Sequence, residues 1–146
     1  MTSIKLGLIG QKITYSLSPD IHGMAARQCD LAVQYKVFNI APAKLKKTLD
    51  QCWEDSFQGL NITTPFKEQV VPFLENSEAS SVNTLYRGRD YWQGASTDGD
   101  GFLEALKRQG SSIQGFKRVA ILGNGGVVSS LLGAFHRSSP GLSIAI

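Results

Sequence analysis

The sequence predicts an α/β fold, and two observations point to it. Short apolar runs rich in β-branched residues alternate along the chain with segments whose apolar residues recur at helical spacing. A hydrophobic run near the C-terminus also leads directly into a glycine-rich turn and then into another helical segment. Such alternation is typical of a mostly parallel sheet flanked by helices. We therefore expect this architecture over most of the chain.

The expected strands are short and mainly apolar. They cover Lys5–Ile9, Gln34–Ile40, Gly59–Ile62, Val82–Tyr86, Tyr91–Gly94, Arg118–Leu122 and Leu142–Ile146. A polar turn, 87–90, separates two of them, and this spacing predicts an antiparallel hairpin.

The expected helices begin after these strands. Pro19 suits the first turn of a helix and Ser18 suits its N-cap, so the first helix should run from Pro19 to about Cys29. Three others are expected over Ala43–Trp53, Gly101–Gln109 and Val127–His136. A further helix should begin at Pro65, and its apolar side would consist of Phe66, Val70, Phe73 and Leu74.

The glycine turn Gly123-Asn124-Gly125-Gly126 lies between a predicted strand and a predicted helix. A bound pyrophosphate requires this arrangement, because glycines permit the tight turn and close backbone approach while the helix N-terminus supplies N–H donors. Position 128, where a third glycine would complete the usual fingerprint, is valine. We interpret the segment as the start of a Rossmann-like βαβ unit, which is incomplete because the chain stops near its second strand.

Composition excludes several classes of protein. The formal net charge is +3, with 42% hydrophobic and 18% charged residues, which is unlike a disordered chain. No apolar run reaches the roughly 18 residues of a membrane span, and the N-terminus lacks the pattern of a signal peptide. We expect a cytoplasmic protein without membrane contact. The lysines at 44, 46 and 47 fit a solvated helix face better than a phosphate-binding patch, so no nucleic-acid partner is expected.

Cysteine and histidine residues provide no metal site. Cys29 and Cys52 lie far apart without a pattern of neighbouring ligands, so we expect two buried free thiols. His22 and His136 are expected to have structural roles.

Four segments contain polar side chains that the packing of an apolar core does not require: 15–19, 61–67, 81–85 and 97–102. Most of these segments lie at predicted strand–helix junctions. Ligands of open α/β sheets bind outside the carboxyl ends of the strands. The segments offer hydroxyls, amides, an ammonium group and carboxylates. This set suits a small polyhydroxylated acid.

In order and spacing, these segments resemble the shikimate dehydrogenase family, and the likeness extends from Gly7 through the glycine turn. The resemblance implies NADPH-dependent reduction of 3-dehydroshikimate to shikimate, in aromatic amino-acid biosynthesis. It also implies a substrate-binding domain over 1–100, followed over 101–146 by a linker helix and a truncated start of the dinucleotide-binding domain. The chain departs from the family pattern at Tyr15, Ser96, Asn124 and Val127.

The resemblance also assigns site residues. Lys67 and Asp98 would form the catalytic pair: Lys67 would protonate the developing alkoxide, and Asp98 would orient Lys67 and bind a ring hydroxyl. The implied substrate-binding residues are Ser16, Ser18, Asn61, Thr63, Lys67, Asn83 and Asp98. The implied NADP-binding residues are Gly123, Asn124, Gly125, Gly126 and Val127.

Taken singly, these residues have simpler interpretations. Ser18 could be a helix cap, Asn83 a turn residue and Lys67 a surface lysine, and Asp98 and Asp100 could cap the helix that follows. At the level of the whole chain, a non-catalytic module that binds a shikimate-like acid, or an inactive truncated relative, stays open beside the dehydrogenase. The apolar final strand would leave an open sheet edge, which favours a homo-oligomer.

Overall fold

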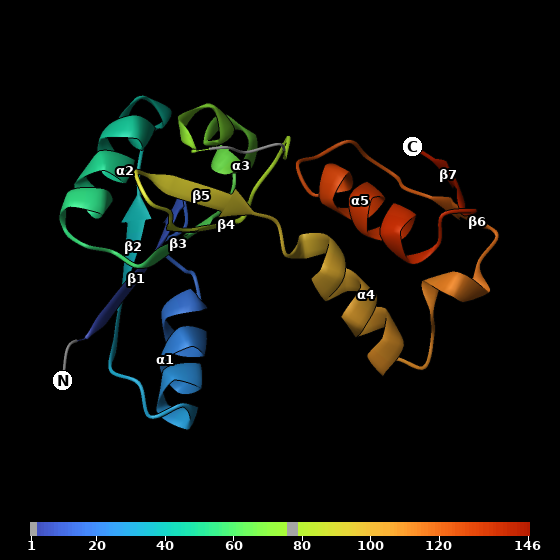
Figure 1. Ribbon diagram of the computed structural model, residues 1–146, viewed down its shortest axis with the longest axis horizontal. Helices are drawn as coiled ribbons and strands as arrows, with labels where there is room; N and C mark the ends of the chain where they lie inside the picture. The colour runs from blue at the N-terminus through green and yellow to red at the C-terminus, as the bar shows by residue number, and fades with distance from the viewer. Residues whose placement is uncertain (1–2, 76–78) are drawn as a thin grey trace. The chain divides into compact units, whose positions relative to one another are not determined.

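A computed structural model describes residues 3–75 and 79–146. The chain divides into two compact units, Met1–Ala95 and Ser96–Ile146. Each unit combines strands with helices, as Figure 1 shows, and the α/β prediction is confirmed.

The first unit contains a five-stranded sheet in the order β2-β1-β3-β4-β5. The strands are β1 (Ile4–Gly10), β2 (Val33–Asn39), β3 (Gly59–Ile62), β4 (Thr84–Arg87) and β5 (Trp92–Ala95). β1 pairs in parallel with both β2 and β3, whereas β4 is antiparallel to β3 and to β5. The sheet is therefore mixed, and the predicted hairpin is confirmed.

Helices cover both faces of this sheet (Figure 1). One face holds α1 (Ser18–Gln28), and the other holds α2 (Leu45–Glu54) and the short α3 (Phe66–Gln69). The main core lies under α2 and α3 and combines buried residues of the helices and the strands: Ile9, Leu45, Leu49, Cys52, Leu60, Ile62, Phe66, Val70, Leu85 and Trp92. This core fixes the strands whose ends carry the predicted site residues.

Two predictions about these helices are wrong. The helix predicted from Pro65 ends at Gln69 and is followed by a 3-10 turn, η2 (Val71–Phe73), because Pro72 lacks an N–H and disfavours helical backbone at the residue before it. Ser18 is not the N-cap of α1. It is the first helical residue, and Leu17 occupies the cap without a side-chain hydrogen bond.

Another 3-10 turn, η1 (Pro42–Lys44), precedes α2.

The second unit is built around a parallel pair of strands. It comprises α4 (Asp98–Arg108), the 3-10 turn η3 (Ile113–Gly115), β6 (Arg118–Ala120), α5 (Val128–Ser138) and β7 (Ser143–Ala145). β6 and β7 pair in parallel, and α5 connects them, so the predicted βαβ unit is present. α4 begins at Asp98 rather than at the predicted Gly101.

Close packing of α4 on α5 depends on Gly99. A Cβ atom at this position would lie 2.3 Å from the carbonyl oxygen of Ser130 and 2.7 Å from the Cβ of Ala134. The Gly99 N–H donates to the Ser130 Oγ at 2.9 Å, and the Ser96 hydroxyl donates to the same Oγ at 2.9 Å. Glycine thus lets the first turn of α4 approach the α5 backbone.

The structure corrects the prediction for one cysteine. Cys52 is buried, but Cys29 is exposed, because it follows the last residue of α1 at the outer end of the helix. Burial raises the pKa of the Cys52 thiol to about 12.

Within residues 3–75 and 79–146, no helix combines the length and the apolar character needed to cross a membrane.

We predict that Gly99→Ala destabilises the protein, because the added methyl group must displace the α5 backbone. The expected loss is about 1–3 kcal/mol in the free energy of unfolding, measured by urea denaturation. Gly101→Ala is the matched control in the same helix, since a Cβ there meets no atom within 4 Å. It should stabilise the protein by about 0.5–1 kcal/mol. Equal effects of the two substitutions would contradict this packing.

We also predict that one thiol reacts rapidly with Ellman's reagent in the native protein, because only Cys29 is exposed as a free thiol. The Cys29→Ser variant should lose the rapid phase, and Cys52 should react only after unfolding. Rapid labelling of the Cys29→Ser variant would show that Cys52 is accessible.

Candidate functional site

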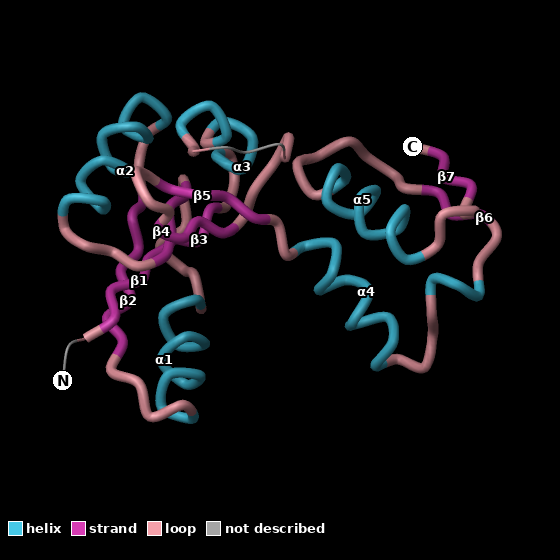
Figure 2. The backbone as a smooth tube through the Cα atoms, in the orientation of Figure 1, coloured by secondary structure: helices cyan, strands magenta, loops and turns pink. Residues whose placement is uncertain are grey.

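The predicted site residues of the first unit lie at one edge of its sheet. β1 and β3 are parallel, so their carboxyl ends reach the same edge, where Ile9 pairs with Ile62. β4 begins at this edge and β5 ends there, because Thr84 pairs with Asn61 on one side and Ala95 on the other. The segments that carry these residues therefore begin or end at this edge. Figure 2 shows the strands of the sheet in magenta.

The loop after β1 brings Ser16 and Ser18 into contact. The Ser16 hydroxyl donates to the Ser18 Oγ at 3.1 Å, and the Ser18 N–H donates to the Ser16 Oγ at 3.2 Å. Both serines are partly buried. Two adjacent hydroxyl groups of this kind are able to rotate and donate to a carboxylate.

The segment after β3 runs beside the segment before β4. The N–H of Ile62 donates to the carbonyl of Asn83 at 2.8 Å, and the N–H of Val82 donates to the carbonyl of Lys67 at 2.9 Å. Asn61, Thr63, Lys67 and Asn83 thus come from two short segments held together by main-chain hydrogen bonds.

Local packing directs the side chains of these segments. Phe66 is completely buried, so the side chain of Lys67, the next residue of α3, leaves the helix in another direction and is only partly buried. The Asn83 Oδ1 accepts a hydrogen bond from the Thr84 hydroxyl at 2.9 Å. This bond orients the Asn83 amide so that its N–H groups face away from Thr84.

A residue that the sequence analysis did not single out joins two of these segments. The Tyr35 hydroxyl on β2 donates to the Asn61 Oδ1 at 2.8 Å, and Ser18 also hydrogen-bonds to Tyr35. Burial raises the pKa of Tyr35 to about 12, although the bond from Ser18 opposes this shift. A tyrosine within a β-rich run is unremarkable in sequence, so no local signal distinguishes Tyr35.

His22, predicted to be structural, contacts the same group. Its ring stacks on that of Tyr35 with centroids 4.5 Å apart, and its Nδ1 lies 2.9 Å from the carbonyl oxygen of Ser18. A carbonyl only accepts, so Nδ1 carries a proton in this arrangement. The first turn of α1 is therefore tied to β2.

The catalytic pair implied by the resemblance is divided between the units. Lys67 belongs to the first unit, whereas Asp98 is the first residue of α4 in the second unit. Their pairing stays a prediction. Asp100, interpreted as a helix cap, instead forms an exposed ion pair with Arg137 at 2.8 Å.

The glycine turn has room for a phosphate group. Gly123 has a φ of +116°, which other residues rarely adopt, and a Cβ at Gly123 or Gly125 would meet no atom within 4 Å. The Val128 N–H donates to the Gly125 carbonyl at 2.9 Å, which closes the turn as α5 begins. Asn124 and Val127 are exposed beside it, and Gly126 is partly buried. These residues fit the pyrophosphate of a dinucleotide.

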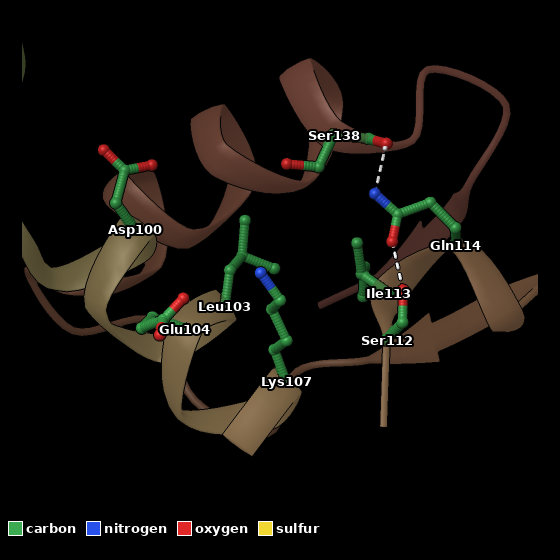
Figure 3. Close-up of a pocket in the computed structure, with 8 residues that line it drawn as sticks. All are labelled: Asp100, Leu103, Glu104, Lys107, Ser112, Ile113, Gln114 and Ser138. Atoms are coloured by element: carbon green, nitrogen blue, oxygen red, sulfur yellow. Dashed lines mark hydrogen bonds between the residues drawn. The ribbon is translucent and has the colours of Figure 1, made fainter. Parts of the chain in front are cut away.

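Two cavities lie away from the predicted site residues. One, of about 220 Å³ in the second unit, is lined by Asp100, Leu103, Glu104, Lys107, Ser112, Ile113, Gln114 and Ser138 (Figure 3). Many of its polar groups bond to protein groups; for example, the Gln114 Nε2 donates to the Ser138 carbonyl. The other, of about 270 Å³, is lined by Phe38, Lys44, Lys47, Thr48 and Gln51. Within the described residues, no three His, Cys, Asp or Glu side chains form a group able to hold a metal ion.

Comparisons with known proteins agree with this arrangement. Residues 8–85 match the family model described as the shikimate dehydrogenase substrate binding domain. The shikimate dehydrogenase (NADP(+)) of Chlorobium phaeobacteroides is 40% identical over 137 residues, which cover 90% of this chain and 46% of that protein.

Solved structures give the same result. Shikimate dehydrogenase from Aquifex aeolicus superposes with a TM-score of 0.87 at 30% identity, covering 97% of this chain and 54% of the other. Shikimate 5-dehydrogenase from Thermus thermophilus, in complex with NADP(H) and shikimate, has a TM-score of 0.85 at 28% identity and the same coverage. The chain thus spans about half the length of the relatives it matches. Because the family model matches more than half of its residues, the chain belongs to the shikimate dehydrogenase family.

Proposed function

We propose that this chain supplies the substrate-binding domain of a shikimate dehydrogenase, which reduces 3-dehydroshikimate to shikimate with NADPH. The observation that carries the proposal is the convergence of Ser16, Ser18, Asn61, Lys67 and Asn83 around one edge of the first sheet. Hydroxyl, amide and ammonium groups are the donors that a polyhydroxylated carboxylic acid needs.

Each residue has a role that its chemistry supports. Ser16 and Ser18 donate to the substrate carboxylate. Asn61, Thr63 and Asn83 hold the ring hydroxyls. Lys67 donates a proton to the carbonyl oxygen of the substrate as that oxygen gains negative charge, and Asp98 orients Lys67 and binds a neighbouring hydroxyl.

The cofactor is expected at the glycine turn of the second unit. Gly123, Asn124, Gly125, Gly126 and Val127 hold the pyrophosphate through main-chain N–H groups, aided by the positive end of the α5 dipole. NADPH, when bound, supplies the hydride for the reduction. Assembly into a homo-oligomer and action in the cytoplasm stay predictions.

We predict that Lys67→Ala lowers turnover by about 10²–10⁴-fold, because the variant lacks the group that donates the proton in the reduction and accepts it in the reverse oxidation. The measurement is NADPH formation by the purified protein with shikimate and NADP. Lys47→Ala, which removes an exposed lysine of α2, is the matched control and should behave as wild type.

Three outcomes are decisive. Normal turnover by Lys67→Ala would remove the central element of the proposal. Shikimate binding without turnover in the wild-type chain would favour the binding module over the dehydrogenase. Absence of shikimate binding, measured by calorimetry, would contradict the proposed substrate.

A further inference from the structure

We propose that Tyr35 is a positioning residue that fixes the Asn61 carboxamide with its N–H groups presented to the substrate. The proposal rests on the proposed function of the site and deepens it. It states what kind of substrate atom Asn61 recognises: an acceptor oxygen.

The register of the sheet places the two side chains on the same face. Tyr35 pairs with Leu6 of β1, and Asn61 pairs with Leu8. Because Leu6 and Leu8 are two residues apart on one strand, their side chains share a face, and so do those of their partners. This is the face covered by α1, opposite the core that contains Leu60 and Ile62.

The Tyr35 hydroxyl is the donor in its bond to Asn61. It donates to the Asn61 Oδ1 at 2.8 Å, and the Ser16 hydroxyl donates to the Ser18 Oγ at 3.1 Å. A tyrosine hydroxyl is protonated at neutral pH, and burial, which raises the pKa of Tyr35 to about 12, keeps it a donor into the alkaline range.

The bond to Tyr35 determines which end of the amide is left for a ligand. With Oδ1 engaged by Tyr35, Nδ2 is the end of the amide that is left to donate to a ligand. An amide nitrogen only donates. A substrate hydroxyl or carboxylate oxygen would therefore accept from Asn61, whereas a group that only donates would be rejected.

The ring of Tyr35 is held independently of its hydroxyl. It stacks on His22, whose Nδ1 bonds to the Ser18 carbonyl of α1. Replacing Tyr35 by phenylalanine should therefore keep the ring in place and remove only the bond to Asn61. This makes the role of the hydroxyl separable from a role in folding.

The test compares Tyr35→Phe with Tyr86→Phe, which removes the hydroxyl of an exposed tyrosine on β4. In the protein without ligand, the NMR signals of the Asn61 side-chain amide should shift in Tyr35→Phe and not in Tyr86→Phe, while the unfolding midpoint stays near that of wild type. An unchanged Asn61 amide in Tyr35→Phe would overturn the proposal.

The second measurement is shikimate affinity. Tyr35→Phe should raise the Kd about tenfold, and the same substitution should have less than about a threefold effect in an Asn61→Ala background. Equal losses in both backgrounds would show that Tyr35 does not act through Asn61, and would overturn the proposal. If the Asn61 amide shifts but the wild-type chain does not bind shikimate, the proposed function fails, and the substrate-positioning role fails with it.

Discussion

Parallel pairing of β1 with β3 is the constraint on which the candidate site depends. Ile9 and Ile62 are paired and fully or almost fully buried, so a slip of one residue would turn apolar side chains of β3 toward the opposite face. With the register set in this way, the carboxyl ends of both strands meet at one edge. The loop with Ser16 and the segment with Lys67 must then emerge together, and the hairpin of β4 and β5 adds Asn83.

One short strand serves both the core and the site. In β3, Leu60 and Ile62 are buried in the core under α2, while Asn61 between them projects to the face covered by α1. There it meets Tyr35. Burial of the flanking residues therefore holds the strand that presents the polar amide, which is how a rigid scaffold orients a binding group.

Local patterns in the sequence predict most of the elements, because amphipathic spacing determines which segments become helices or strands. One error is local: Pro72 shortens a predicted helix, and its effect is readable from the sequence. Other features depend on position in the fold, such as the exposure of Cys29 at a helix end. The contact of Tyr35 with Asn61 depends on strand register, which no local pattern contains. The motifs at 61–67 and 97–98 identify Lys67 and Asp98 as candidates, but a pair with one member in each unit cannot be derived from either segment alone.

The central claim is that the polar segments of the first unit form one binding site for a shikimate-like acid. The most direct test is an NMR titration of the labelled chain with shikimate, mapped residue by residue. Main-chain amides of 16–18, 61–64, 66–67 and 83–84 should shift together with one dissociation constant. Shifts confined to the neighbourhood of Lys44 and Lys47, which line the cavity of about 270 Å³ in the first unit, would contradict this claim.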